Sequence, residues 1–223
     1  MPVKFDLTAD MFPPSWRSGE IQATAIQIAD NQIARSTVIS DKAMSKYPPE
    51  VLTKNLKAVY FVKEMRFYGL QYGGTNSREN VYITNRGPVM GFSDKFVEAT
   101  FHHEFSSILL RNYNSLFDEK GWTHSNRPGT HYGSSGMQAL KEGNADTTYM
   151  DVYNVDGFLN QYAKASIEED FNTFAEALFS GDREYWRIVS LFPRVQKKHK
   201  IAIQFFHSID PQFTEDYFRS LVQ

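Results

Sequence analysis

The stretch Phe101-His102-His103-Glu104-Phe105-Ser106-Ser107-Ile108-Leu109 decides how the chain is interpreted. It begins the pattern His-Glu-x-x-His, in which two imidazoles one helical turn apart face the same metal ion. His103 and Glu104 supply the first two letters, and Ser107 stands where the second imidazole belongs. The stretch therefore predicts a metal-site helix that lacks one ligand.

The residues around this stretch predict a long helix over residues 93–113. Ser93 is a favourable N-cap, and Asp94 suits the positive end of the helix dipole in the first turn. The helical period continues through four apolar side chains, Val97, Phe101, Ile108 and Leu109.

The segments before this helix predict a sheet. Residues 56–62 are rich in β-branched and aromatic side chains and are expected to form a strand that continues through 65–68, and residues 80–84 are expected to form another. The glycines predict a turn at 73–76. Helices are expected over 21–35, from its apolar stripe, and from Pro49 to about Asn55.

The segments after it predict a loop followed by helices. Residues 118–150 show little periodicity, and a helical block begins near Gly157 and continues to 222, with a break at Asp210-Pro211. Segregated strands and helices favour an α+β fold, with a small mixed sheet packed on the helix 93–113 and a mainly helical C-terminal part. We expect one domain over residues 1–223, divided into 1–92, 93–113 and 157–223.

Composition excludes several classes of protein. The 223 residues include 41% hydrophobic ones, which suffices for a sizeable core. The net charge is −2 and gives no reason to expect nucleic acid as a partner. The absence of cysteine excludes disulfides and thiolate metal sites. No apolar run suits a membrane span, and the first residues lack signal-peptide features, so we expect either a cytoplasmic protein or a leader already removed.

The residue types of the motif suit zinc chemistry. A catalytic zinc takes about three protein ligands and keeps one position open for water, whose proton passes to a nearby carboxylate. His103 would be the first ligand and Glu104 the general base. Further along, Glu169 and Glu176 are seven residues apart, share a helix face and could supply a later ligand.

Four short motifs in this order carry a family resemblance. His103-Glu104-Phe105, Gly157-Phe158, Tyr162-Ala163 and Glu169-Asp170-Phe171 resemble a family of bacterial zinc-binding metallopeptidase lipoproteins encoded beside TonB-dependent nutrient importers. The same layout is more distantly similar to the catalytic domain of anthrax lethal factor. The resemblance covers about residues 80–180.

This resemblance implies a zincin-like fold with zinc as cofactor. It implies His103 and Glu169 as metal ligands, Glu104 as catalytic base and Tyr162 as the hydroxyl that stabilises the tetrahedral intermediate. Residues 80–84 would be the edge strand to which a peptide adds. It also implies a location in the cell envelope, attached to the outer membrane or periplasmic, with the outer-membrane import machinery as a partner.

Two positions depart from the family pattern, and three hypotheses follow. Ser107 replaces the second histidine, and Thr173 stands four residues after Glu169, where lethal factor has a second acid.

The first hypothesis is a degenerate peptidase homologue with weak or absent zinc binding and a binding role. The second is an active zinc peptidase that recruits a replacement ligand such as His131, or a water held by Ser107. The third is an interaction module unrelated to zincins.

The remaining histidines and the aromatic residues have plainer interpretations. We expect His102 to make a polar contact of the helix, because it points about 100° away from His103. His124 and His131 fall in the predicted loop, and His199 and His207 are interpreted as structural. The abundant aromatic side chains are expected in the core rather than in a sugar-binding surface.

Overall fold

The computed structural model describes residues 1–222 and has the predicted α+β class. The chain divides into two compact units, Met1–Ile108 and Leu109–Gln223, and each is described here by itself. Helix α3 (Asp94–Asn112) contributes its first part to the first unit and its last turn to the second. The single domain expected over 1–223 stays a prediction.

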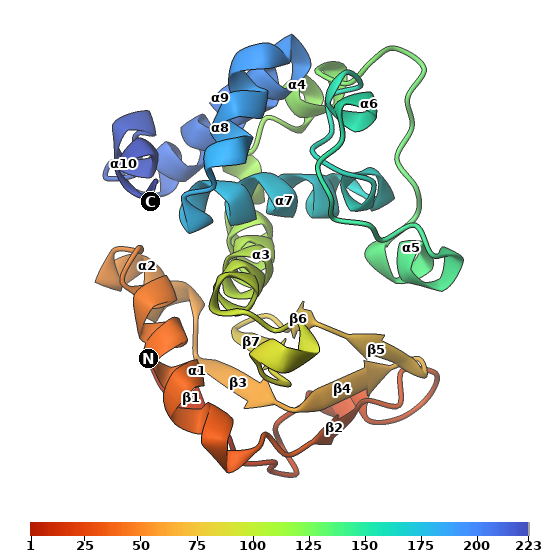
Figure 1. Ribbon diagram of the computed structural model, residues 1–223, viewed down its shortest axis with the longest axis vertical. Coiled ribbons are helices and arrows are strands. Elements are labelled where there is room, and N and C mark those ends of the chain that lie inside the picture. Colours follow the sequence, from red (N-terminus) through yellow and green to blue (C-terminus); the bar gives the residue numbers. More distant parts are fainter. Residues whose placement is uncertain (223) are drawn as a thin grey trace. The chain divides into compact units, whose positions relative to one another are not determined.

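The first unit contains two small sheets (Figure 1). In the four-stranded sheet, β1, β3 and β7 are parallel and β6 is antiparallel to β7, in the order β1-β3-β7-β6. The three-stranded sheet is antiparallel in the order β2-β4-β5. The bounds are β1 Val3–Lys4, β2 Thr24–Ile26, β3 Ala58–Val62, β4 Glu64–Phe67, β5 Leu70–Tyr72, β6 Gly74–Asn76 and β7 Asn80–Thr84.

The two central strands carry the clearest sequence signal. All of β3 is buried, and β7 is buried from Val81 onward, as expected for parallel strands covered on both faces. Tyr60 and Tyr82 stack at a centroid distance of 5.1 Å. The strands predicted at 56–62 and 80–84 are therefore confirmed.

The helices of the first unit are α1 (Asp30–Met44), α2 (Pro49–Asn55) and the first part of α3, with short 3-10 turns at Pro14–Trp16 and Pro88–Met90. Helix α2 agrees with its prediction. Ser93 caps α3 as predicted, because its hydroxyl accepts a hydrogen bond from the Phe96 N–H at 3.2 Å.

Three local predictions for the first unit were wrong. Residues 24–26 form β2, whose backbone pairs with β4, so the helix begins only at Asp30. The strand from 56 does not continue to 68, because Lys63 separates β3 from β4 in the other sheet. Residues 74–76 form β6 and not a turn; the chain reverses after them, where the Ser77 N–H bonds the Asn80 carbonyl at 2.9 Å.

The second unit is helical. Its α-helices are α4 (Glu119–His124), α5 (Gly136–Glu142), α6 (Asp151–Asn154), α7 (Ile167–Ser180), α8 (Arg183–Leu191), α9 (Pro193–Ile209) and α10 (Glu215–Ser220), with 3-10 turns η3 (Asn114–Leu116) and η4 (Tyr162–Ala165). The helical C-terminal part and the break at Asp210 are confirmed, since α9 ends at Ile209. Its predicted start near Gly157 was wrong, because residues 157–161 are irregular and α7 begins at Ile167.

The loop predicted over 118–150 was wrong in two places. Asp118 caps α4, and Ser135 caps α5 by accepting a hydrogen bond from the Gln138 N–H at 3.1 Å. Gly143 ends α5 in the left-handed conformation. These capping residues were the available signal, but both helices are too short to show an apolar period.

Aromatic side chains fill the core of the second unit, as predicted. Phe171 contacts Phe205 edge-to-face at 5.0 Å, and Phe179 contacts Phe218 in the same way at 4.9 Å. Trp122 is fully buried and lies 5.0 Å from Phe174. The edge-to-face geometry is the one that the ring quadrupoles favour.

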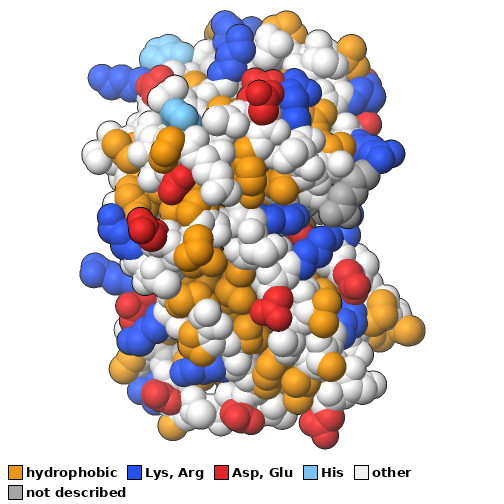
Figure 2. All heavy atoms as spheres, turned by 90° about the vertical axis from the view of Figure 1, so that its left-hand side faces the viewer, with side chains coloured by type: hydrophobic (Ala, Val, Ile, Leu, Met, Phe, Trp, Pro, Cys, Tyr) orange, Lys and Arg blue, Asp and Glu red, His pale blue; other side chains and the backbone are white. Residues whose placement is uncertain are grey.

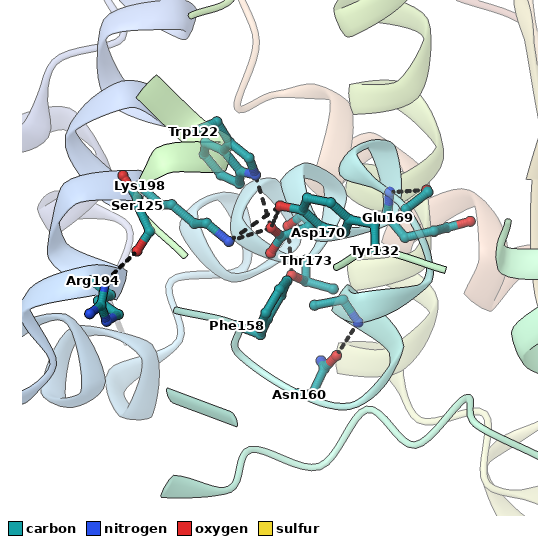
Figure 3. A network of polar contacts seen from close by, with 12 residues as sticks. Trp122, Ser125, Tyr132, Phe158, Asn160, Glu169, Asp170, Thr173, Arg194 and Lys198 are labelled. Atoms are coloured by element: carbon teal, nitrogen blue, oxygen red, sulfur yellow. Dashed lines mark hydrogen bonds and ion pairs between the residues drawn. The ribbon is translucent and has the colours of Figure 1, made fainter. Parts of the chain in front are cut away.

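A buried carboxylate joins four segments of the second unit. Asp170, in the first turn of α7, accepts hydrogen bonds on Oδ2 from the Trp122 indole at 2.9 Å, the Tyr132 hydroxyl at 2.6 Å and the Lys198 ammonium at 2.5 Å (Figure 3). The Lys198 ammonium also lies 4.3 Å from the centre of the Phe158 ring. Asp170 and Lys198 are both fully buried, so each charge depends on this geometry for compensation.

Surface charge shows no single sign on the face drawn in Figure 2, where basic and acidic side chains are interspersed. Among the described helices, none is both long and apolar enough to span a lipid bilayer.

Replacing the buried ammonium should destabilise the second unit. Burial raises the pKa of Asp170 against the lowering effect of Lys198, so Lys198→Met leaves a carboxylate that is costly to keep ionised. We expect a loss of about 3–5 kcal/mol in the free energy of unfolding, measured by urea denaturation followed by circular dichroism. Lys197→Met, at the exposed neighbouring position, should change it by less than about 0.5 kcal/mol. Equal effects of the two substitutions would show that the buried pair contributes nothing.

Candidate functional site

The residues of the His-Glu motif lie on α3 within the first unit. His103 is half-buried, whereas Glu104 and Ser107 are 9% and 3% exposed. Four residues separate His103 from Ser107, so their side chains leave the same helix face one turn apart. The structure therefore places a serine hydroxyl where the motif would place a second imidazole.

Glu104 is tied to the strand at the end of the four-stranded sheet. Its Oε2 accepts a hydrogen bond from the Asn76 amide at 2.8 Å, and Asn76 is the last residue of β6. A Cβ built on Gly74 would lie 2.6 Å from Glu104 Oε1 and 2.5 Å from Thr100 Cγ2. Glycine at position 74 therefore allows β6 to approach α3 closely enough for this hydrogen bond.

The edge strand beside Glu104 differs from the predicted one. We expected residues 80–84 to form the edge, but β7 is paired on both sides, with β3 and with β6. The strand at the end of the sheet is β6, in the segment interpreted from sequence as a turn. The error arose because three residues that include a glycine have no strand signal of their own.

His102 belongs to a separate buried cluster, as expected for a polar contact of the helix. The Tyr47 hydroxyl lies 2.9 Å from its Nδ1, and Glu98 Oε1 lies 3.8 Å from its Nε2. Glu98 also forms ion pairs with Lys46 and, at 2.9 Å, with Lys42. This cluster joins α3 to the C-terminal end of α1.

Charge in this cluster is set by burial and by the two lysines. Burial lowers the pKa of His102 to about 4, although the Glu98 carboxylate opposes this effect. Burial alone would raise the pKa of Glu98, but the nearby His102 imidazole and the Lys46 and Lys42 ammonium groups outweigh it and hold that pKa at about 2. His102 is therefore a neutral imidazole beside an ionised carboxylate near pH 7.

Tyr162 and Glu169 lie close together in the second unit. A Cβ built on Gly136 would lie 2.2 Å from Glu169 Oε1 and 2.5 Å from the Tyr162 hydroxyl oxygen. The two oxygens are therefore no more than 4.7 Å apart, the sum of these distances. Ser166 fixes the start of α7 by accepting a hydrogen bond from the Glu169 N–H at 3.1 Å.

The structure thus groups the predicted site residues into two sets, His103, Glu104 and Ser107 in one unit and Tyr162 and Glu169 in the other. That the two sets share one site stays a prediction. Thr173 donates its hydroxyl hydrogen bond to the Asp170 carbonyl at 2.8 Å, so it satisfies the backbone of its own helix. The proposed replacement ligand His131 lies on an exposed segment.

The available donors do not fit a catalytic zinc ion. Such an ion takes three ligands from imidazole, thiolate and carboxylate groups. The motif offers one imidazole and a neutral hydroxyl, and the chain has no thiolate. Among residues 1–222 there is no group of three or more His, Asp or Glu side chains that could hold a metal.

The sequence analysis did not predict two groups of residues that shape these sites. The partners of Asp170 lie 28 or more residues away along the chain, and no local pattern pairs them. Asn76 and Gly74 were missed because their segment was interpreted as a turn.

The contact between β6 and α3 can be tested with two adjacent glycines. Gly74→Ala places a methyl group against Thr100 and Glu104, so β6 or Glu104 must move and the Asn76 hydrogen bond is lost. We expect a destabilisation of about 1–3 kcal/mol in urea denaturation. Gly73→Ala is the matched control, because its added carbon meets only Phe96 Cζ at 3.6 Å. If both variants are equally stable, the close approach at Gly74 does not constrain the strand.

The His102 cluster predicts acid sensitivity. Folding lowers the pKa of His102 from 6.5 to about 4. Its contribution to the free energy of unfolding is therefore complete above pH 6.5 and is lost as the pH falls to about 4. The contribution of Glu98 is lost at lower pH, between about 4.5 and 2. We expect urea denaturation to show a loss on the order of 2 kcal/mol between pH 7 and pH 5.

His102→Asn should remove most of this loss between pH 7 and pH 5. His124→Asn, at an exposed position on α4, should retain it. An unchanged pH dependence in His102→Asn would show that another group causes the acid sensitivity.

Comparison with known proteins identifies the fold. A crystal structure from Bacteroides caccae, provisionally assigned as a zinc-binding metallo-peptidase, matches with a TM-score of 0.54 and 12% sequence identity. The match covers 83% of this chain and 74% of that chain. No family model matches the sequence, and no curated protein matches it. At this level of identity the likeness shows the fold alone, so the chain has a metallopeptidase-like α+β fold.

Proposed function

We propose that this protein is a degenerate metallopeptidase homologue that binds an extended peptide and has lost zinc-dependent hydrolysis. The observation that carries the proposal is Ser107, a buried serine one helical turn from His103 on α3. A neutral hydroxyl is a poor zinc ligand compared with imidazole or carboxylate. Without the second imidazole, the affinity of the site for zinc should be low.

The contacts of Glu104 support a binding role. In a zinc peptidase this carboxylate would accept the proton of the metal-bound water. Here one of its oxygens accepts the hydrogen bond from Asn76 and so fixes β6 against α3. The side chain that would act as a base thus serves to position a strand.

The position of β6 suits a peptide partner. The strand pairs with β7 on one side and ends its sheet. A sheet edge presents backbone N–H and C=O groups to which an extended peptide can add as a further strand. In this proposal Glu104 and Asn76 keep that edge at a fixed distance from α3.

The wider setting of the proposal comes from the family resemblance. It supports a role in bacterial nutrient uptake at the cell envelope, with the outer-membrane import machinery as partner.

Zinc titration of Ser107→His tests the loss of a ligand. We expect wild-type protein to bind zinc weakly in isothermal titration calorimetry, and Ser107→His to bind roughly a hundredfold more tightly because an imidazole is added beside His103. Lys95→His is the control, because it adds a histidine at an exposed position of the same helix and should leave the affinity unchanged. Circular dichroism checks that each variant is folded.

Three outcomes would contradict the proposal. Tight stoichiometric zinc binding by wild-type protein that disappears in His103→Ala would show that the site is not degenerate. No gain in Ser107→His would show that the remaining residues are not arranged around a former metal. Chelator-sensitive cleavage of a peptide library that is abolished by Glu104→Gln would establish an active peptidase.

A further inference from the structure

A hollow of about 470 Å³ lies within the second unit, apart from the residues assigned above. One wall is formed by residues between Gly133 and Asn144, on α5 and beside it, and the other by Tyr153, Gln161, Lys164 and Ala165. Its volume falls within the range of roughly 300–1,000 Å³ that is usual for small-molecule sites.

Backbone hydrogen bonds hold the two walls together. The Gly133 N–H bonds the Lys164 carbonyl at 2.8 Å, and the Tyr162 N–H bonds the Asp146 carbonyl at 3.0 Å. The shape of the hollow is therefore set by the main chain of α5, η4 and the segments beside them.

Three carboxamides in the hollow are arranged around one carboxylate. Glu142 accepts hydrogen bonds from the Gln138 amide at 2.6 Å and the Asn144 amide at 3.3 Å. The Gln161 amide donates to the Asn144 side-chain oxygen at 3.2 Å. Each amide nitrogen has a second N–H, so each side chain is oriented by the protein and retains a donor for a ligand.

An ammonium group and an aromatic ring complete the lining. The Lys164 ammonium lies 6.0 Å from the centre of the Tyr153 ring. With Glu142 it gives the hollow one positive and one negative charge. The lining is therefore formally neutral and offers both donors and acceptors.

We propose that this hollow binds a neutral saccharide of one or two rings. Sugar hydroxyls both donate and accept hydrogen bonds, as carboxamides do, so Gln138, Asn144 and Gln161 can each pair with them. The Tyr153 ring offers an apolar surface for the C–H face of a sugar ring. A phosphate or other anion would meet the Glu142 carboxylate as well as the Lys164 ammonium, so this formally neutral lining gives an anion no net electrostatic advantage. This inference does not depend on the peptide-binding role proposed above.

Binding of simple sugars to the full chain tests the proposal. The probes are the methyl glycosides of glucose, galactose, mannose and N-acetylglucosamine, together with maltose, cellobiose and lactose. Saturation-transfer NMR and isothermal titration calorimetry should show that at least one of them binds with a Kd of about 1 mM or tighter.

Variants of the lining assign this binding to the hollow. Gln138→Ala and Asn144→Ala should each weaken it by about tenfold or more, because an oriented hydrogen-bonding group is lost. Circular dichroism checks that both variants are folded. If either is not, Lys164→Met replaces it and should also weaken saccharide binding. Gln196→Ala, at an exposed position on α9, should leave the affinity unchanged.

Three results would overturn the inference. The first is the absence of binding by every saccharide tested. The second is saccharide binding that is the same in the lining variants and in the wild type. The third is tighter binding of the dipeptide alanyl-alanine than of any saccharide, with that binding lost in the lining variants, which would identify the hollow as a peptide site.

Discussion

The second unit depends on compensating the charge of one buried carboxylate. Asp170 has no access to solvent, so it must find its hydrogen-bond donors within the protein. Trp122 comes from α4, Tyr132 from the segment before α5 and Lys198 from α9, and all three converge on the first turn of α7 (Figure 3). Four segments far apart in sequence are thereby held in one arrangement.

This network also positions the residues next to it. Glu169 precedes Asp170 in the chain, so fixing the first turn of α7 fixes the base of the Glu169 side chain. Tyr132 precedes Gly133, where the wall of the hollow begins, and the Gly133 N–H is bonded to the Lys164 carbonyl of η4. One buried ion pair therefore supports both the Tyr162–Glu169 pair and the hollow, although it belongs to neither.

Local chemistry made the long elements predictable and left the short ones unpredictable. The run 58–62 and the capped helix from Asp94 are specified by their own residues, through β-branched side chains and the Ser93 cap. In contrast, β6 forms because β7 and α3 lie beside it. The need for glycine at position 74 becomes apparent only from the tertiary structure, in which Thr100 and Glu104 lie against it. The same holds for Asp170, whose partners are defined by tertiary packing. For the candidate site, the sequence predicted His103, Glu104, Tyr162 and Glu169 as site residues but gave no indication of what they contact.

A change of one side chain, Ser107 in place of a histidine, alters the metal donors of the motif without altering the fold. This protein shares a fold at 12% identity with a protein provisionally assigned as a zinc-binding metallo-peptidase, because a fold requires only that buried surfaces and backbone hydrogen bonds be satisfied. Hydrolysis requires in addition a complete ligand set, and a hydroxyl in place of an imidazole removes a metal donor while leaving α3 well packed. Under the proposed function Glu104 has no metal-bound water to deprotonate, and its hydrogen bond from Asn76 joins α3 to the strand at the sheet edge. In the proposed function, the hydrogen bond between Glu104 and Asn76 is the part of the site that is kept, because it needs no metal.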